Sequence, residues 1–584
     1  MPFRTALTIL FCTALAQIVP AQNHIMTAPK REVRAVWLTT TMGLDWPRTT
    51  ERGEQQSSLR EIVLTLRRAN FNTIYFQARA RGDAYYRSSY EPWAENLTGT
   101  FGKDPGWDPL AFLLDEAHRS GLEVHVWFNV FKIRGAGPVP PSLPLHPSRS
   151  HPEWTVTYAG EGWLDPGIPE ARAYLVNVAI DIAKNYDVDG FNFDYCRYPG
   201  REFADTETYK RYGGGGSKEE WRKSNIDRWI GECYDRLTAL RPLLKVGASP
   251  LGLTVSPGDP AAGAVREYSQ DARAWLQAGK VDYVSPQLYW DIGSTNGDPD
   301  FAALVRSWQA SANGRQVYPG IGAYKSDILR QAPAQVDSAR RAGTAGQSFF
   351  RYSSIRALAT IGGRYETPAA IPPMRWKDSQ APPAPLTIGV SEVATNVFQL
   401  EWVKPRPGSD GDLVHHYMIY RWPTRQIPFD DPRALAGITS QNGTVYRDSV
   451  EAPAGPTYYY AVSAVDKANN EGPPSPVSGA TLTEFLALKG KLTDATALSA
   501  SLSTRGGVPR IIAYSLARKS NVELSLVGQT PGKPDSVIAP LVRGMQDGGT
   551  YIVGVRELKL APGRYLVRLK TPDATLEQPI DMGP

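Results

Sequence analysis

Short apolar segments alternate with helix-like segments between residues 31 and 365 of the chain. Eight of the apolar segments have the length and the β-branched or aromatic content of buried strands. They are Arg34–Thr40, Thr73–Arg79, Val124–Val130, Gly190–Asp194, Lys245–Ser249, Tyr283–Tyr289, Val317–Ile321 and Gln347–Phe350. The amphipathic stretches between them include Leu59–Ala69, Pro109–Ser120, Glu170–Asn185 and Lys218–Leu240. Strands that alternate with helices predict a parallel sheet covered by helices.

The number of strand segments favours a closed barrel. Eight strand–helix units are the full complement of a (β/α)₈ barrel. The alternative is an open, doubly wound sheet, which commonly carries a glycine-rich phosphate turn after its first strand. No such turn follows Arg34–Thr40. We therefore expect an α/β fold, with a (β/α)₈ TIM barrel over residues 30–372.

The pattern changes after the proline-rich stretch at residues 371–385. Helical periodicity ends there, and strand-like alternation follows. Trp402, the tyrosines at 458–460 and the segment 466–472 resemble a fibronectin type III domain, which we place at residues 383–480. Later alternating segments predict a C-terminal Ig-like β-sandwich at residues 481–584. The barrel is thus expected to be followed by two all-β sandwich domains.

The first 21 residues have the pattern of a secretion signal. Arg4 precedes the apolar stretch Thr5–Val19, and a small-residue cleavage site follows at Val19–Ala21. A buried N-terminal helix is the alternative. The apolar stretch is too short to span a bilayer, and no later segment has the roughly 18 consecutive apolar residues that a spanning helix needs. We expect a signal peptide at residues 1–21 and a secreted or periplasmic protein without a transmembrane helix.

Composition limits the remaining classes of function. Hydrophobic residues make up 42% of the chain and charged residues 21%, which is typical of a folded protein. The 64 basic and 59 acidic residues are too balanced to indicate a nucleic-acid partner. The 3 cysteines are too few for a disulfide framework, and the 7 histidines include no zinc-site spacing. We expect no nucleic-acid partner, no metal and no cofactor.

Alternation within each strand separates side chains that face the helices from side chains that face the barrel interior. The apolar set should face the helices, so a polar and aromatic set is expected inside and at the mouth. Its polar members are Gln77, Arg79, Asn129, Asn192, Asp194 and Gln287, and its aromatic members are Trp37, Trp127, Tyr289 and Trp290. Buried polar groups need partners, and a sugar offers hydroxyl edges and C–H faces. The set therefore predicts a polysaccharide substrate.

Several collinear motifs resemble the glycosyl-hydrolase-like family 10, long classed as a domain of unknown function. They are Arg31–Trp37, Phe76–Tyr86 with Tyr90–Trp93, Asp187–Pro199, Val281–Trp290 and Phe349–Tyr352. The resemblance covers roughly residues 30–370. It implies a glycoside hydrolase that acts on O-glycosidic bonds. The family includes a divisome-associated hydrolase that cuts peptidoglycan glycan strands lacking stem peptides, so cell-wall glycan is the favoured class of substrate.

Asp194 is the leading candidate for catalysis. It ends the fourth predicted strand, and functional groups in such barrels gather where the strands end. A carboxylate there can act as a nucleophile or stabilise an oxocarbenium-like transition state. A helix cap or an ion pair with Arg197 is the structural alternative. Asp189, at the opposite end of the same strand, is expected to be structural.

The sequence leaves the identity of the second catalytic carboxylate open. Residues 189–194 resemble the chitinase signature, but Cys196 stands where that signature has its catalytic Glu. Asp291 and Asp83 follow the sixth and second strands and are the candidates for the partner, although each could instead bind a hydroxyl or cap a loop. Because no clear acid stands beside Asp194, the alternative function is a non-catalytic glycan-binding envelope protein with a degenerate barrel.

Other residues near the predicted mouth are candidates for substrate contacts. The set is Trp37, Asp45, Gln77, Arg79, Trp127, Asn129, Asn192, Arg197, Tyr198, Gln287, Tyr289 and Trp290. Its two arginines could bind a substrate carboxylate or keep site carboxylates ionised, and structural pairing is the alternative for each. The C-terminal sandwiches would position the barrel on an envelope or cell-surface partner.

Overall fold

The computed structural model describes most of the chain. The described residues are 28–136, 146–253, 263–293, 298–356, 361–385, 388–394, 396–440, 443–450, 458–478, 496–502, 509–529, 534–546, 549–554 and 563–582. The signal peptide expected at residues 1–21 lies outside them. Within these ranges, no helix is long and apolar enough to cross a membrane.

The N-terminal region contains ten short parallel strands in one sheet. They are β1 (Val33–Leu38), β2 (Thr73–Arg79), β3 (Glu123–Asn129), β7 (Gly190–Asp194), β8 (Lys245–Ala248), β9 (Tyr283–Val284), β10 (Gln287–Leu288), β11 (Gln316–Val317), β12 (Gly320–Ile321) and β13 (Gly346–Phe349). The predicted sixth strand is divided into β9 and β10 at Ser285-Pro286, and the seventh into β11 and β12 at Tyr318-Pro319. Proline interrupts both strands because it has no N–H to donate.

The two ends of this sheet meet. β8 pairs with β9, and β9 pairs with β11. The other halves of the interrupted strands continue the ring, because β10 pairs with β12, β12 with β13, and β13 with β1. The ten segments therefore form a closed eight-stranded barrel, as the sequence predicts.

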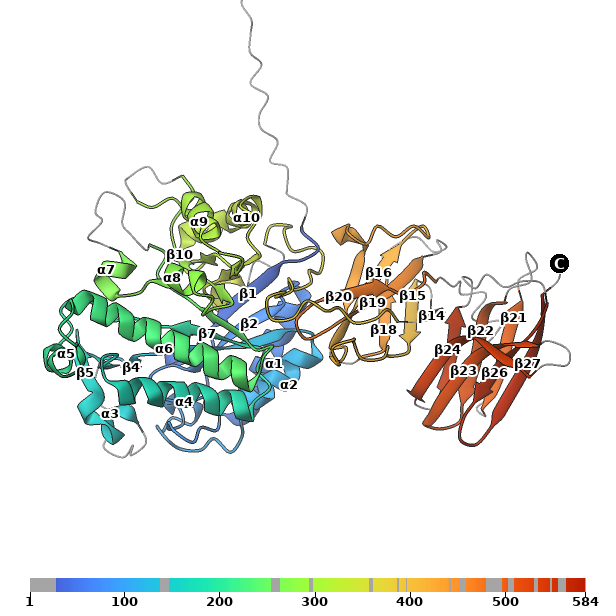
Figure 1. The fold of residues 1–584 in the computed structure, drawn as a ribbon, viewed down its shortest axis with the longest axis horizontal. Helices are drawn as coiled ribbons and strands as arrows, with labels where there is room; N and C mark the ends of the chain where they lie inside the picture. The colour runs from blue at the N-terminus through green and yellow to red at the C-terminus, as the bar shows by residue number, and fades with distance from the viewer. Residues whose placement is uncertain are drawn as a thin grey trace, which may run out of the picture.

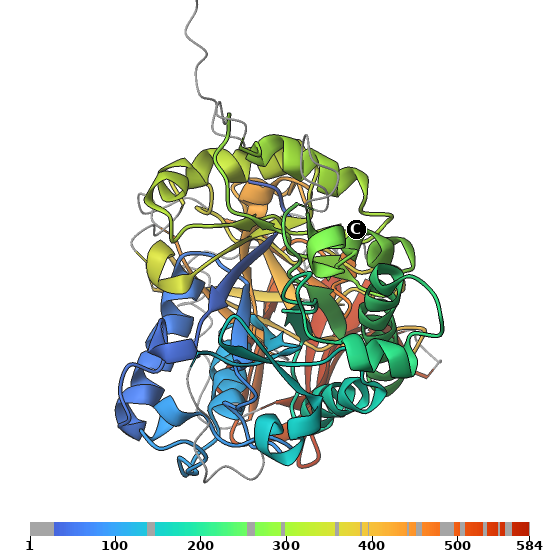
Figure 2. The same ribbon diagram turned by 90° about the vertical axis from the view of Figure 1, so that its left-hand side faces the viewer.

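Helices surround the barrel, as Figure 2 shows from one end. The longer ones are α1 (Arg52–Arg68), α2 (Pro109–Arg119), α4 (Pro169–Asn185), α6 (Lys218–Leu240), α9 (Phe301–Ala310) and α10 (Ser326–Arg341). The shorter ones are α3 (Pro147–Ser150), α5 (Thr206–Tyr212), α7 (Ala264–Tyr268), α8 (Ala272–Gln277) and α11 (Tyr352–Ile355). Side-chain caps fix several helix starts: Asp108 accepts a hydrogen bond from the backbone N–H of Ala111, and Ser217 from that of Glu220.

The two sets of side chains that alternate along the barrel strands lie on opposite faces of the sheet. The apolar side chains of the strands pack with the helices in one large core; they include Val36, Ile74, Phe76, Val124, Val126, Phe191, Phe193, Val246 and Leu288. A separate cluster fills the lumen with Trp37, Tyr75, Trp127, Tyr283 and Tyr318. Several polar groups inside are hydrogen-bonded to one another: the Tyr283 hydroxyl lies 2.7 Å from Nδ1 of His125, and the Tyr75 hydroxyl lies 3.1 Å from Oγ of Ser285. The lumen is therefore a packed core, and any ligand site is confined to its rim.

A small antiparallel sheet follows β3, in the order β4-β6-β5. Its strands are β4 (Lys132–Arg134), β5 (Thr155–Tyr158) and β6 (Glu161–Leu164). The sequence does not predict this sheet, because strands of three or four residues are too short for alternation to stand out. It extends the barrel rim beside the end of β7. The backbone N–H of Leu164 donates to the backbone carbonyl of Phe131, and the backbone N–H of Val130 donates to the backbone carbonyl of Asp194.

Two β-sandwiches follow the barrel, in a row (Figure 1). The first pairs the sheets β14-β15-β18 and β17-β16-β19-β20. Its strands are β14 (Ile388–Ala394), β15 (Val397–Trp402), β16 (His416–Trp422), β17 (Leu435–Ile438), β18 (Val445–Ser449), β19 (Tyr459–Val465) and β20 (Glu471–Pro474). Phe398 and Leu400 from one sheet share a core with Tyr417, Tyr460 and Val462 from the other. All seven strands lie within the expected range 383–480.

The second sandwich pairs the sheets β21-β22-β25 and β24-β23-β26-β27. Its strands are β21 (Ala497–Leu502), β22 (Pro509–Leu516), β23 (Ser520–Gln529), β24 (Ser536–Gln546), β25 (Gly549–Gly554), β26 (Gly563–Lys570) and β27 (Thr575–Met582). Ile512 and Tyr514 pack against Leu524, Leu526 and Val567 across the sandwich. The two predicted all-β domains are thus present.

The first sandwich contacts the N-terminal end of the barrel. Nζ of Lys467 lies 2.8 Å from Oδ1 of Asp187, just before β7, and Arg67 at the end of α1 donates to the carbonyl of Ile438 at 3.1 Å. The C-terminal ends of the strands face the opposite way, toward the left of Figure 1. The sandwiches therefore leave the barrel mouth uncovered.

The packed lumen predicts that Gly247 on β8 tolerates no side chain. A Cβ there would lie 2.3–2.4 Å from ring atoms of Tyr283. We expect Gly247→Ala to destabilise the barrel by about 1–3 kcal/mol, because the ring must move out of a close-packed core. Urea unfolding followed by tryptophan fluorescence measures the change.

Gly231 on α6 provides the matched control, because a Cβ there meets nothing within 4 Å. Gly231→Ala should stabilise the protein by about 0.5–1 kcal/mol through helix propensity. Equal stabilities of Gly247→Ala and the wild type would contradict a filled lumen.

Candidate active site

Asp194 lies at the mouth of the barrel, at the last residue of β7. Its side chain is partly exposed, although the neighbouring Phe193 is buried. Oδ1 of Asp194 accepts a hydrogen bond from the backbone N–H of Tyr195 at 2.7 Å and lies 3.4 Å from Nε2 of Gln287. Tyr195 has a φ of 51°, a left-handed conformation that is uncommon for a residue other than glycine. The chain thus turns sharply directly after the carboxylate, as occurs at functional sites.

The surroundings of Asp194 favour its neutral form. Burial raises the pKa of its carboxyl to about 6, although the Tyr195 N–H, the Arg197 charge, the Trp127 indole and the Lys132 charge all act in the opposite direction. Desolvation therefore outweighs the nearby donors and cations. A carboxyl group with this pKa can both donate and accept a proton near neutral pH, which is the requirement for a general acid.

Two cations stand beside Asp194. Nζ of Lys132 on β4 lies 2.7 Å from Oε1 of Glu161 on β6 and 4.9 Å from the centre of the Tyr195 ring. The guanidinium of Arg197 lies 5.3 Å from the same ring. Glu161 is a mouth carboxylate that sequence reasoning missed, because it lies in a tight hairpin without a motif or an apolar pattern.

Aromatic side chains form the opposite part of the rim. Tyr289 stacks on Phe350 with ring centres 5.8 Å apart, and Tyr324 lies 5.8 Å from Tyr289. Burial raises the pKa of Tyr289, and the charge of Asp194 raises it further, so the two side chains are neighbours. Tyr324, which the sequence did not single out, is 48% exposed. Exposed rings next to a carboxyl group suit the C–H face of a sugar.

The structure thus brings Asp194, Arg197, Gln287 and Tyr289 together, with Trp127 beneath them. Trp127 is buried and lies 6.1 Å from the ring of Phe350, below the exposed rim. Trp290 is partly exposed, and its backbone carbonyl accepts from the Gln335 amide of α10 at 3.0 Å. These residues come from strands far apart in the chain, as the barrel prediction requires.

Arg79 belongs to the scaffold, contrary to its expected contact with substrate. Its side chain is fully buried. It forms a two-pronged ion pair with Glu91, with nitrogen–oxygen distances of 2.6 and 2.7 Å, and also donates to the carbonyl of Val130 at 3.0 Å. All three nitrogens of the Arg79 guanidinium thus have partners within the protein, as the structural alternative expects.

Asp45 and Gln77 are likewise held within the structure. Asp45 is buried, lies 3.0 Å from the Arg351 guanidinium and accepts from the backbone N–H of Thr39 at 2.9 Å. The side-chain oxygen Oε1 of Gln77 accepts hydrogen bonds from the backbone N–H groups of Thr40 and Thr41, at 3.0 and 2.9 Å. Both side chains fix the loop after β1 instead of facing a ligand.

Four other expected contact residues lie below the rim. They are Trp37, Asn129, Asn192 and Tyr198, each at most 4% exposed. Trp37 donates to Oδ1 of Asn192 at 3.2 Å, Asn129 donates to the Ala80 carbonyl at 2.7 Å, and Asn225 donates to the Tyr198 hydroxyl at 3.3 Å. Each of these four side chains makes a hydrogen bond within the protein, while Oδ1 of Asn129 is buried without a partner among the described residues.

The two candidates for the second carboxylate differ. Asp83 is 1% exposed and accepts from the backbone N–H of Arg81 at 2.7 Å, which closes a tight turn. Asp291 is partly exposed, and its Oδ1 is buried without a hydrogen-bond partner among the described residues. Of the two candidates, Asp291 therefore has a carboxylate oxygen that no described residue binds.

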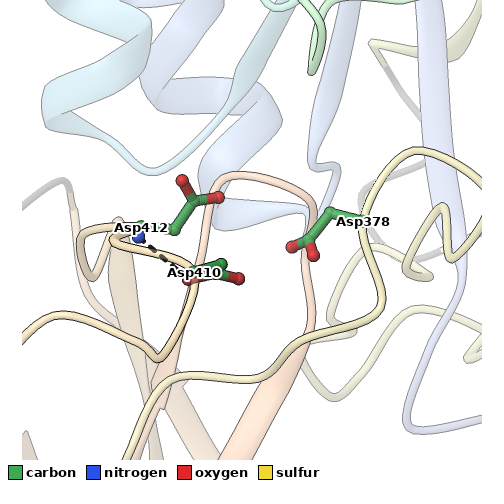
Figure 3. Close-up of side chains that lie close together, drawn as sticks. All are labelled: Asp378, Asp410 and Asp412. Carbon is green, nitrogen blue, oxygen red and sulfur yellow. Dashed lines mark hydrogen bonds between the residues drawn. The ribbon is translucent and has the colours of Figure 1, made fainter.

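One group of side chains has the composition of a cation site, but it lies away from the mouth. Asp378, Asp410 and Asp412 place ligand atoms within 4.8 Å of one another, in the linker and in the loop between β15 and β16 (Figure 3). Asp378 also accepts from the Asn470 amide at 3.0 Å. Acidic groups at a surface are common without an ion, so this cluster does not define a metal centre.

A closed (β/α)₈ barrel with a carboxyl group of raised pKa and exposed aromatic rings at its mouth is the arrangement of a glycan-acting hydrolase. The chain belongs to the family glycosyl hydrolase-like 10, whose model matches residues 32–336. This confirms the family that the motifs predict.

Two relatives that are more than 30% identical agree with this assignment. The chain is 31% identical to glycosyl hydrolase YngK of Bacillus subtilis over 485 residues, which cover 76% of this chain and 92% of that protein. It is 32% identical to glycosyl hydrolase DigH of Escherichia coli K12 over 335 residues, which cover 52% of this chain and 76% of that protein. Among solved structures, the PgaB (BpsB) glycoside hydrolase domain of Bordetella bronchiseptica matches with a TM-score of 0.40 and 13% identity, covering 57% of this chain and 99% of that one.

The raised pKa of Asp194 predicts a pH-dependent cost in stability. The pKa of about 6 in the folded protein exceeds the ordinary value of about 4. The contribution of this carboxyl to the free energy of unfolding is therefore greatest below pH 4 and is lost as pH rises through 6. We expect Asp194→Asn to be more stable than the wild type by about 1–3 kcal/mol at pH 8 and nearly equal to it at pH 4. Thermal unfolding at the two pH values measures this.

Asp189 provides a control of opposite sign. Although burial opposes it, the His118 charge and the Val124 N–H lower the pKa of Asp189, so its contribution is present above pH 4 and is lost as pH falls. Asp189→Asn should therefore destabilise the protein at pH 8. An Asp194→Asn variant that is no more stable than the wild type at pH 8 would contradict a desolvated carboxylate.

Proposed function

We propose that the chain is an exported glycoside hydrolase that cleaves O-glycosidic bonds in a polysaccharide, with peptidoglycan glycan strands as the favoured substrate. The observation that carries the proposal is the partly exposed Asp194 carboxyl at the barrel mouth, whose pKa burial raises to about 6. Membership of the family and the similarity to the glycosyl hydrolases YngK and DigH support the reaction class.

Asp194 acts as the general acid in this mechanism. Its proton goes to the glycosidic oxygen as the bond to the sugar breaks, and positive charge develops on the ring. Gln287 and the Tyr195 N–H hold Oδ1 in place, and we assign the transferred proton to Oδ2. We favour this role over the nucleophile or charge-stabilising role expected from the sequence, because a pKa of about 6 lets the group hold a proton at mildly acidic pH.

We assign the second carboxylate to Asp291. It follows the sixth barrel strand, is partly exposed and has an oxygen without a partner in the described structure. Either it attacks the sugar to form a covalent glycosyl-enzyme that water then hydrolyses with Asp194 as the base, which retains configuration overall, or it activates a water that displaces the leaving group in one step, which inverts it. Carboxyl groups about 5–5.5 Å apart in the substrate complex indicate the first mechanism, and about 6.5–9.5 Å the second.

The substrate lies over the aromatic rim. Tyr289, Phe350 and the exposed Tyr324 provide flat apolar surfaces for a sugar face, and Gln287 is positioned for a hydroxyl. The mouth faces away from the two sandwiches, so the sandwiches can bind an envelope or cell-surface partner while the barrel reaches a long polymer. The leader pattern at residues 1–21 supports export.

Replacing the acid should abolish turnover. We expect Asp194→Asn to lower kcat/KM on peptide-free peptidoglycan strands by about 10²–10⁴-fold, because the amide cannot donate the required proton. In the wild type, kcat/KM should fall as pH rises above about 6, where Asp194 deprotonates. Release of reducing ends from a panel of polysaccharides, followed against pH, measures both effects.

The same assay tests the alternative function. If wild type and Asp194→Asn both bind a glycan and neither cleaves it, the protein is a glycan-binding protein with a degenerate barrel. Equal cleavage by the two proteins would contradict the role of Asp194.

The partner carboxylate is tested by comparing two acids at the mouth. We expect Asp291→Asn to lower kcat by about 10²-fold or more and azide to restore part of the activity, since azide can take the place of a missing carboxylate. Glu161→Gln should have a smaller effect, because Glu161 is neutralised by Lys132 at 2.7 Å. The reverse order, with rescue of Glu161→Gln alone, would transfer the role to Glu161.

A further inference from the structure

Arg197 has unused hydrogen-bond donors at the barrel mouth. It lies three residues beyond Asp194, in the loop after β7, and its side chain is partly exposed. Among the described residues, its guanidinium donates one hydrogen bond, from Nη1 to the Tyr198 carbonyl at 3.3 Å. It forms no ion pair within the part of the chain that the structure describes. A guanidinium has five N–H donors, so most of its capacity is free for a ligand.

Aromatic rings surround this guanidinium. Its central carbon lies 4.9 Å from the ring centre of Tyr268, 5.3 Å from that of Tyr195 and 5.7 Å from that of Trp163. The rings come from α7, from the β7 loop and from β6, so three separate parts of the chain hold one side chain. Such contacts fix the planar group and remove water from it without neutralising its charge.

Neighbouring cations, by contrast, have acidic partners. Lys132 pairs with Glu161 at 2.7 Å, Arg222 with Asp205 at 2.6 Å, and Arg201 with Glu267 at 3.1 Å. The charge of Arg197 acts on Asp194, but the two side chains form no ion pair in the described structure, and Oδ1 of Asp194 accepts from Tyr195 and Gln287. The positive charge of Arg197 is therefore held in place and left for an anion from outside.

We propose that Arg197 determines specificity by binding a carboxylate on a sugar unit beside the glycosidic bond that Asp194 cleaves. The inference rests on the proposed function and narrows its substrate to an acidic glycan. Two parallel N–H groups on the edge of a planar guanidinium match the two oxygens of a carboxylate. Two kinds of glycan supply one: the lactyl ether carboxylates of peptide-free peptidoglycan, and the ring carboxylates of a polyuronate.

The test separates binding from turnover. Full-length Asp194→Asn protein is titrated calorimetrically with peptide-free peptidoglycan oligosaccharides and with oligogalacturonate. Each is compared with the same oligosaccharide after its carboxylates have been reduced to alcohols. We expect one acidic glycan to bind, and carboxyl reduction to weaken that binding by about 10- to 100-fold, the loss typical of a charged hydrogen-bonded pair. Which acidic glycan binds identifies the source of the carboxylate.

Adding Arg197→Met should weaken binding of the acidic glycan by the same factor and leave the reduced glycan unaffected. Arg197→Lys keeps the positive charge but loses the two parallel N–H donors of the guanidinium. Its affinity for the acidic glycan should lie between those of the Arg197 protein and the Arg197→Met protein. Arg201→Met is the matched control: it removes an arginine of the same loop that already pairs with Glu267, and affinity should not change. Unchanged thermal unfolding of the Arg197 variants shows that they are folded.

Equal affinity for the acidic and reduced glycans would overturn the proposal, as would unchanged affinity after Arg197→Met or the absence of binding to either acidic glycan. These outcomes differ from a failure of the proposed function. That function fails if the wild type binds glycans without cleaving them, or if Asp194→Asn still cleaves them, whatever the preference at Arg197.

Discussion

The desolvation of one carboxyl group at the end of β7 is the constraint on which the site depends. A backbone donor and two cations act on Asp194, and in water they would keep it ionised. Burial at the barrel rim outweighs them and raises its pKa to about 6. The ionised form of Asp194 therefore destabilises the folded protein near neutral pH. For the same reason the carboxyl binds a proton more readily than it would in water, which makes it useful as an acid.

Closure of the barrel determines where such a group can be. Eight strands leave an interior just wide enough for side chains, and here Trp37, Tyr75, Tyr283 and Tyr318 fill it. Most polar side chains inside make hydrogen bonds within the barrel, as Tyr283 does with His125, so the exposed polar groups lie where the strands end. The first sandwich is attached at the opposite end of the barrel, through contacts such as Lys467 with Asp187, and leaves the rim open to a polymer.

The strands and the position of Asp194 could be predicted because strand periodicity and the order of elements are local properties of the chain. The ranges of β2, β7 and α6 agree with those expected from the sequence. How deeply a side chain lies within the barrel could not be predicted: alternation places Arg79 inside, but its burial against Glu91 depends on how the loop after β2 folds back. Glu161 was missed for a related reason, since it reaches the mouth through a hairpin of short strands, and the rings around Arg197 come from three separate elements.

The pKa of the Asp194 carboxyl is the measurement that tests this account most directly. Infrared difference spectra between wild type and Asp194→Asn, recorded across pH, isolate the protonated C=O band of this side chain. The account predicts a titration midpoint near pH 6 in the folded protein. A midpoint near the ordinary value of about 4 would show that the carboxyl is solvated, and would contradict its role as the acid.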